Sequence, residues 1–384
     1  MTVRVRTLAW QGVAIGAALL LGAACTTGGG PTPPTTSPSS PGAAGTAAPG
    51  GLTANIGKDD KASLTGAGAT FPAPVYQAWF DNYKRGVAKG VQINYQAIGS
   101  GGGIQQYTEK TVDFGASDAP MSDDELKKAP DTTHVPMVVG AVVLTYNIQG
   151  ITTPLKLDGA TVGKIFLGDI KKWNDAAIAA TNPGVNLPAN DIQVVHRSDG
   201  SGTSFVFTDW LSNVSPDWKS KVGTNKNPNW PAGQGGQGNA GVTQVVKQTP
   251  NSIGYVELNY AIENKLPYAD IKNRAGKFVT PNLDSVTAAA SKATIPDDYR
   301  VSIVNAEGDT AYPVASFTYL LVAKDRASCE KQAPLVHFMW WAFHDQSASA
   351  TAKQLNYSPV PAEVVTKIES TLKSLKCEGK AILG

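Results

Sequence analysis

Between a short apolar segment, 192–195, and a stretch of helical character, 205–211, the chain contains the octet Arg197-Ser198-Asp199-Gly200-Ser201-Gly202-Thr203-Ser204. A strand, a tight turn and a helix start leave several backbone N–H groups without helical partners, at an end that the helix dipole makes partly positive. Ser201, Thr203 and Ser204 add hydroxyl donors, and Arg197 adds a planar set of donors that suits an oxyanion. The octet by itself is compatible with an anion site and also with an ordinary capped turn that carries a surface arginine.

Two further small-residue turns precede predicted helices. One ends in Thr70 and Phe71, directly before apolar residues at helical spacing, and the other contains Ser100 and follows an alternating strand at 91–95. Strands that alternate with helices along 384 residues predict an α/β fold with largely parallel sheets and two lobes. In such sheets ligands bind at the loops beyond the carboxyl ends of the strands, which is where all three turns are expected.

A tetrahedral oxyanion requires many donors that converge from several directions, because its desolvation must be offset at nearly every oxygen. Three helix starts, the arginine and four hydroxyl groups would supply them, from Thr70, Ser100, Ser201 and Thr203. Sulfate carries no proton near neutral pH, whereas phosphate carries at least one. A carboxylate in such a site would therefore accept a hydrogen bond from phosphate and repel sulfate.

Composition limits the classes of partner. The 33 basic residues include Arg4 and Arg6 of a predicted leader, so the remainder equals the 31 acidic residues. A near-neutral chain predicts no nucleic-acid binding. The sequence has no C-x-x-C motif, its four histidines are scattered, and it lacks a P-loop and a complete dinucleotide-binding fingerprint, so we expect neither a metal nor a cofactor.

The N-terminal residues are typical of an exported lipoprotein. A basic end and an apolar run lead to Leu21-Gly22-Ala23-Ala24-Cys25, which predicts a signal peptide at 1–24 and lipidation of Cys25. Such signals usually have leucine three places before the cysteine, where Gly22 stands here. Residues 25–61, rich in Gly, Pro, Ser and Thr, predict a disordered tether. If Cys25 carries lipid, Cys329 and Cys377 remain, and two cysteines of an exported domain are expected to form a disulfide.

At several of these motifs the chain resembles the PstS family, the phosphate-binding proteins of phosphate-specific ABC importers. The matching runs are LTGAGATFPAPVY (64–76), IGSGGG (98–103), VDFGASDAP (112–120), RSDGSGTSFVF (197–207) and IGYVE (253–257). The resemblance spans nearly everything after the tether. It implies a two-lobed periplasmic-binding-protein type II fold with the ligand in the interlobe cleft, lobe I comprising 62–138 and 313–384 and lobe II comprising 139–312.

The resemblance also implies the site. The family's phosphate contacts match Thr70, Phe71 (through its backbone N–H), Ser100, Asp118, Arg197, Ser201, Gly202 and Thr203. Asp199 matches the acid that orients the arginine, and Asp118 matches the carboxylate that accepts the phosphate proton; composition alone does not single Asp118 out. The implied protein is a receptor and not an enzyme. It is held at the outer face of the membrane by its lipid, and its partners are inorganic phosphate and the transmembrane permease of the importer.

Two other functions fit the same residues. An exported phosphate-ester hydrolase would use Ser201 as its nucleophile, although Asp199-Gly200-Ser201-Gly202 lacks the first glycine of the G-x-S-x-G motif. A surface sensor or adhesin would bind phosphate without transporting it, and a lipid tether fits that function too.

Overall fold

The computed structural model describes residues 55–151 and 153–383, so the predicted leader, Cys25 and most of the tether lie outside the described residues. Residues 55–59, which composition assigns to the end of the tether, form turns. Ile56 packs against the hydrophobic core, and an Asp60 carboxylate oxygen lies 2.7 Å from Nδ1 of His337. The folded part therefore extends at least to residue 55.

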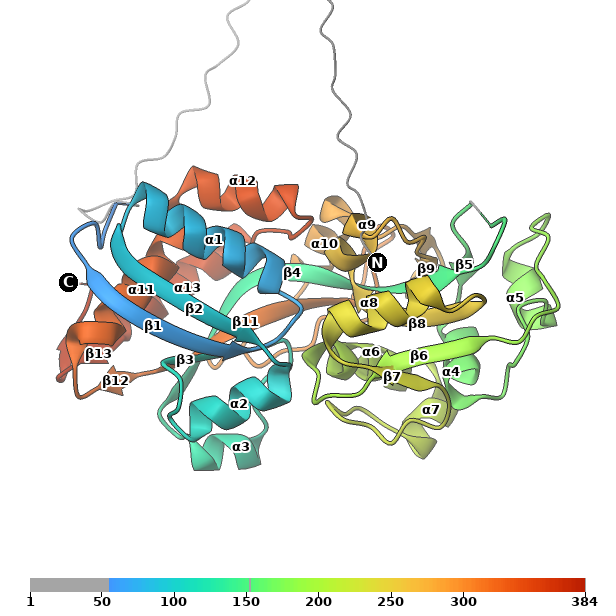
Figure 1. Cartoon of the computed structure of the whole chain (residues 1–384), viewed down its shortest axis with the longest axis horizontal. Coiled ribbons are helices and arrows are strands. Elements are labelled where there is room, and N and C mark those ends of the chain that lie inside the picture. The colour runs from blue at the N-terminus through green and yellow to red at the C-terminus, as the bar shows by residue number, and fades with distance from the viewer. Residues whose placement is uncertain (1–54, 152, 384) are drawn as a thin grey trace, which may run out of the picture. The chain divides into compact units, whose positions relative to one another are not determined.

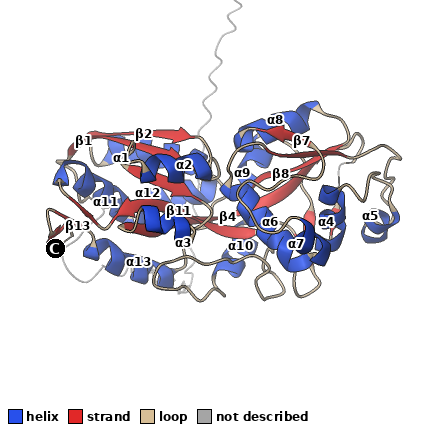
Figure 2. Cartoon of the chain, turned by 90° about the horizontal axis from the view of Figure 1, so that it is seen from below, coloured by secondary structure: helices blue, strands red, loops and turns tan. Residues whose placement is uncertain are grey.

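One mixed sheet passes through both halves of the folded part (Figures 1 and 2). Its eight strands are, in spatial order, β2 (Gly90–Ala97), β1 (Lys61–Gly68), β3 (Phe114–Ser117), β11 (Ala315–Ala323), β4 (Thr132–Asn147), β8 (Ser252–Glu257), β6 (Gln193–Arg197) and β7 (Gln234–Gly236). The pairs toward the two ends are parallel, whereas β3–β11, β11–β4 and β4–β8 are antiparallel. The α/β class is confirmed, but the expectation of largely parallel sheets is wrong at the centre.

The central strand β4 explains this exception. Its residues up to Ala141 pair with β11, and from Val142 onward it pairs with β8. The chain leaves the first half along β4 and re-enters it at β11, and strands that run in opposite directions pair antiparallel. We call the part built on β1, β2, β3 and β11 lobe I, and the part built on β6, β7 and β8 lobe II.

Helices cover both lobes, and two small sheets complete the fold (Figure 1). The lobe I helices are α1 (Ala73–Gly86), α2 (Ser100–Thr108), α3 (Asp123–Lys128), α11 (Cys329–His344), α12 (Gln346–Gln354) and α13 (Ala362–Ser374). The others are α4 (Gly159–Leu167), α5 (Ala176–Thr181), α6 (Gly202–Val214), α7 (Pro216–Lys221), α8 (Gly238–Gln248), α9 (Leu258–Glu263) and α10 (Leu283–Ala290). The small sheets contain β5 (Lys156–Leu157), β9 (Asp270–Lys272) and β10 (Phe278–Val279), and β12 (Asp325–Arg326), β13 (Lys376–Cys377) and β14 (Lys380–Ala381).

Local predictions about the helices hold. The apolar face of α1 is buried as its helical spacing predicts, and α3 begins with a capping box formed by Ser122 and Glu125. The predicted disulfide between Cys329 and Cys377 is confirmed, and it joins the start of α11 to β13. None of the described helices is long and apolar enough to cross a membrane.

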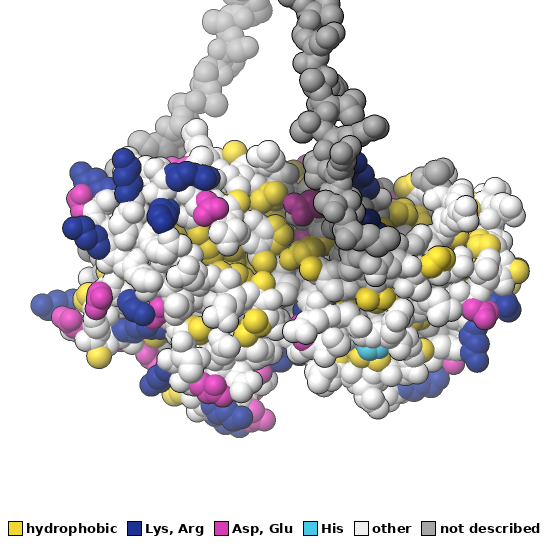
Figure 3. All heavy atoms as spheres, in the orientation of Figure 1, with side chains coloured by type: hydrophobic (Ala, Val, Ile, Leu, Met, Phe, Trp, Pro, Cys, Tyr) yellow, Lys and Arg dark blue, Asp and Glu magenta, His cyan; other side chains and the backbone are white. Residues whose placement is uncertain are grey.

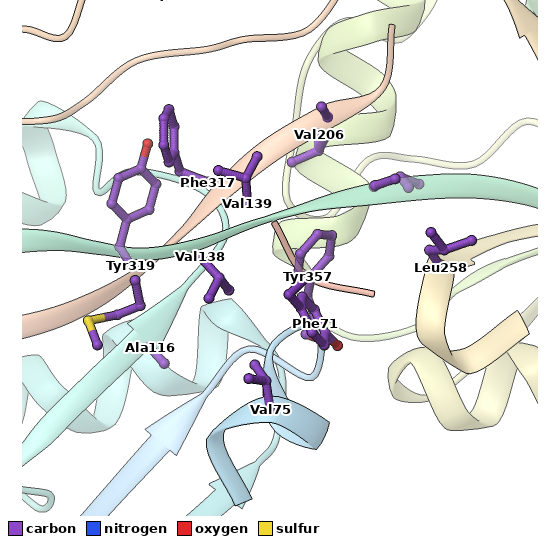
Figure 4. Packing of buried hydrophobic residues seen from close by; sticks show 14 of the residues in the cluster. Phe71, Val75, Ala116, Val138, Val139, Val206, Leu258, Phe317, Tyr319 and Tyr357 are labelled. Atoms are coloured by element: carbon purple, nitrogen blue, oxygen red, sulfur yellow. The ribbon is translucent and has the colours of Figure 1, made fainter. Parts of the chain in front are cut away.

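The core continues between the lobes. Phe71 and Tyr357 lie side by side near β4, with ring centroids 6.3 Å apart, and Leu258 of lobe II lies beyond them (Figure 4). On the face that Figure 3 shows, charged side chains of both signs lie mainly toward the two ends and hydrophobic side chains gather near the middle. Phe71, in the loop that precedes α1, is part of this shared core.

Candidate functional site

The octet places a buried arginine at the end of β6. Arg197 is 2% exposed, and its Nε and Nη2 donate to the two carboxylate oxygens of Asp199 at 2.8 and 2.6 Å. Burial opposes ionisation of Asp199, but the hydrogen bonds and charge of Arg197 outweigh it and lower the pKa of Asp199. Nη1 donates to Oγ1 of Thr203 at 3.2 Å. Asp199 thus holds the guanidinium in one orientation, with the carboxylate ionised.

The first turn of α6 follows directly. Ser201 is its N-cap residue, and its Oγ accepts from the backbone N–H of Ser204 at 3.0 Å. A Cβ at Gly202 would lie 2.4 Å from Oγ of Ser100 and 2.5 Å from Oδ2 of Asp118. Only glycine fits there, and its small size allows the start of α6 to approach these two lobe I residues.

Asp118 lies on the lobe I side of the same cluster and is 1% exposed. Its Oδ1 accepts from the hydroxyl of Thr318 at 2.9 Å, and its backbone N–H donates to Oγ of Ser100 at 3.3 Å. Burial raises the pKa of Asp118 from 3.8 to about 7, against the lowering effects of the Thr318 hydrogen bond and the charge of Arg197. Asp118 can therefore hold or release a proton near neutral pH.

Thr70 and Phe71 precede α1 and reach the cluster from lobe I. Oγ1 of Thr70 accepts from the side-chain amide of Asn239 at 2.9 Å, and the same amide donates to Oγ1 of Thr203 at 3.2 Å. The carbonyl of Phe71 accepts from the hydroxyl of Tyr357 at 2.7 Å. These contacts connect the start of α1 with the start of α6.

The structure thus brings every residue that the sequence predicts for the site into one buried cluster. These residues are Thr70, Phe71, Ser100, Asp118, Arg197, Asp199, Ser201, Gly202 and Thr203. Within the described ranges the backbone N–H groups of Phe71, Gly202 and Thr203 find no acceptor. Free N–H groups at helix starts, with hydroxyl groups and a braced arginine, can together bind a tetrahedral anion.

Several contacts join the lobes around this cluster. The N–H of Gly101 donates to the carbonyl of Gly200 at 2.8 Å. The ammonium of Lys226 lies 2.6 Å from Oε1 and 2.7 Å from Oε2 of Glu125. Because these bonds connect elements of different lobes, the structure holds the lobes in contact about the site.

Sequence reasoning missed two polar residues here, Asn239 and Thr318. Asn239 is fully buried at the start of α8, where it follows the glycine-rich loop 233–238. That loop is a fourth small-residue turn before a helix, and this signal could have pointed to Asn239. Thr318 lies within the apolar strand β11, and no local signal distinguishes it.

His196 lies beside the octet but outside the cluster. Its Nδ1 lies 2.9 Å from the carbonyl oxygen of its neighbour Arg197, and its ring stacks on Trp230 with centroids 4.9 Å apart. No histidine is hydrogen-bonded to Ser201 in the part of the chain that the structure describes. The geometry therefore gives Ser201 a capping role, and the serine–histidine pair of a hydrolase is not formed within the described residues.

A family model and curated relatives both match this chain over most of its length. The family model described as PBP superfamily domain matches residues 37–343. The phosphate-binding protein PstS of Pasteurella multocida is 45% identical over 315 residues, which cover 81% of this chain and 90% of that protein. The phosphate-binding protein PstS of Methanocaldococcus jannaschii is 41% identical over 298 residues, covering 71% and 76%.

Solved structures show the same fold. A high-affinity periplasmic phosphate-binding protein bound with phosphate matches with a TM-score of 0.65 at 20% identity, over 80% of this chain and 93% of that chain. At this identity the likeness concerns the fold alone.

Proposed function

The chain belongs to the PstS family of phosphate-binding proteins, within the PBP superfamily, and on that premise we propose that it is the extracytoplasmic receptor of a phosphate ABC importer. It binds inorganic phosphate between its lobes and delivers it to the transmembrane permease. The observation that supports this most directly is the burial of Arg197, Asp118 and three helix starts in one cluster.

Within this proposal nearly every group around the anion is a donor. The phosphate oxygens accept from the backbone N–H groups, from the hydroxyls and from the guanidinium, at Thr70, Phe71, Ser100, Arg197, Ser201, Gly202 and Thr203. Asp118 accepts the proton of the phosphate. Sulfate has no proton to offer, so the ionised carboxylate repels it.

In this proposal lobe I comprises 62–138 and 313–384, and lobe II comprises 139–312. They move about β4, whose partner changes from β11 to β8 between Ala141 and Val142. A hinge of this kind opens the site to solvent and closes it over the anion, and the permease recognises the closed form.

The proposal includes attachment to the outer face of the membrane through a lipid on Cys25, after removal of 1–24. Cys25→Ser should release the protein from membranes into the medium. Mass spectrometry of the membrane-bound protein should find the added lipid at the new N-terminus. Membrane retention of the Cys25→Ser protein would contradict the anchor, and it would leave the binding function standing.

A titration tests the binding function. Purified protein is titrated calorimetrically near pH 9, where Asp118 is ionised, with phosphate, sulfate and a chromogenic phosphate ester, and the ester is also followed for turnover. We expect binding of phosphate, much weaker binding of sulfate and no turnover, because Oγ of Ser201 caps α6 and no histidine among the described residues is hydrogen-bonded to it. Turnover that Ser201→Ala abolishes would establish the hydrolase in place of the receptor.

A further inference from the structure

Asn239 of lobe II makes two contacts with Thr70 of lobe I and one with Thr203 of its own lobe at the predicted anion site. Its Nδ2 donates to Oγ1 of Thr70 at 2.9 Å and to Oγ1 of Thr203 at 3.2 Å, and its backbone N–H donates to Oγ1 of Thr70 at 3.1 Å. Its Oδ1 accepts from the backbone N–H of Glu257 at 3.0 Å. Asn239 is fully buried, so water does not compete for these contacts.

The contact with Glu257 determines the orientation of the amide. A backbone N–H can only donate, so the side-chain atom of Asn239 that faces it must be the oxygen. The NH₂ group must then face Thr70 and Thr203 and donate to both. This assignment rests on chemistry and not on the similar shapes of the two ends of an amide.

The two threonine hydroxyls consequently have no lone pair to spare. A hydroxyl oxygen has two acceptor positions. Thr70 Oγ1 receives the backbone N–H and the side-chain N–H of Asn239. Thr203 Oγ1 receives the side-chain N–H of Asn239 and Nη1 of Arg197. Among the described residues neither hydroxyl donates its own proton, so each remains available as a donor only.

We propose that Asn239 is a positioning residue that makes Thr70 and Thr203 donors toward the bound anion and thereby leaves Asp118 as the acceptor for a ligand proton. This inference rests on the proposed phosphate function. Asn239 acts through the two threonines and need not touch phosphate. Both hydrogen bonds from Asn239 to Thr70 cross between the lobes and form only when the lobes meet, whereas the two donors to Thr203, Asn239 and Arg197, lie in its own lobe.

Substitution with aspartate reverses this polarity with little change in shape. In Asn239→Asp the new oxygen accepts where the NH₂ group donated, so each threonine gives its proton to the carboxylate and turns a lone pair toward the anion. Asn239→Ala removes the amide and leaves both hydroxyls free to rotate and donate. The polarity role therefore predicts that the isosteric aspartate weakens binding more than alanine does. The new carboxylate also repels the anion, so the deuteron positions of the unmodified protein, described below, decide between the polarity role and charge repulsion.

The experiment is a phosphate titration of the whole protein and of three variants. We expect Asn239→Ala to weaken phosphate binding about tenfold and Asn239→Asp on the order of a hundredfold or more. Gln244→Glu adds a charge at an exposed position of the same helix and should bind like the unmodified protein. Thermal unfolding monitors the fold of each variant.

The polarity role also makes a prediction about pH dependence. Relative to the unmodified protein at the same pH, Asn239→Asp should regain about tenfold in phosphate affinity when its carboxyl is protonated near pH 5, because a carboxylic acid again offers a donor. The relative affinity of Asn239→Ala should stay constant. If Asn239→Asp binds as well as Asn239→Ala or better, or shows no recovery at low pH, the inference is wrong.

Neutron diffraction of the unmodified protein with bound phosphate tests the same point without a substitution, should Asn239→Asp fail to fold. We expect deuterons between Nδ2 of Asn239 and both threonine oxygens, and threonine deuterons directed at phosphate. A threonine deuteron directed at Asn239 would overturn the inference and leave the receptor function intact. Failure of the unmodified protein to bind phosphate would overturn the proposed function and this inference with it.

Discussion

The substitution Asp118→Asn tests how the site separates phosphate from sulfate. The carboxyl of Asp118 is buried, accepts from Thr318 at 2.9 Å and lies near Arg197, and its pKa is raised to about 7. A sulfate ion offers no proton, so it fits only when Asp118 itself carries one. The amide that Asp118→Asn introduces, by contrast, can donate at every pH and has nearly the same shape.

The magnitude follows from the pKa of Asp118. Its protonated fraction is nearly complete near pH 6 and falls about tenfold for each pH unit above about 7. Sulfate affinity of the unmodified protein should therefore fall on the order of a hundredfold from near pH 6 to near pH 9. In Asp118→Asn it should be nearly flat. Near pH 9 the variant should bind sulfate about a hundredfold more tightly than the unmodified protein does.

Calorimetric titrations with phosphate and sulfate at these two pH values measure the effect. Asp199→Asn is the matched control, because it removes the same charge from the same cluster while Asp199, whose pKa is lowered, does not titrate in this range. Sulfate affinity that is equal at both pH values in the unmodified protein would refute the reasoning. So would an Asp118→Asn protein that is folded and still excludes sulfate.

Three further variants test other parts of the structure. Arg197→Lys should weaken phosphate binding about a hundredfold in calorimetry, because an ammonium cannot replace the planar donors of the guanidinium; unchanged affinity would remove Arg197 from the site. Lys226→Ala should weaken it about threefold at low salt and less at high salt, because the Lys226–Glu125 pair joins the lobes and is partly exposed; a salt-independent loss would contradict this. Replacing Cys329 and Cys377 with serine should cost about 4 kcal/mol in denaturant unfolding, since the bridge spans a separation of 48 residues; an unchanged midpoint would contradict that estimate.

Much of the site could be predicted from the sequence because its parts are local. A strand, a small-residue turn and a helix start are adjacent in the chain, so the donors of Arg197, Ser201 and Thr203 follow from one octet. The turns at Thr70 and Ser100 follow in the same way. Asp118 required the family resemblance, since nothing in its own surroundings distinguishes it from a surface carboxylate.

The sequence by itself determined the helix starts, the α/β class and the cysteine pair, all of which depend on short-range pattern or on composition. Only the tertiary structure decided the partners of the site residues. Asn239 meets Thr70 across 169 residues, and Thr318 meets Asp118 across 200. Only the tertiary structure shows that the centre of the sheet is antiparallel, because the directions of β4 and β11 depend on how the chain passes between the lobes. Hydrogen-bond polarity inside the cluster arises from these distant contacts, and no local pattern encodes them.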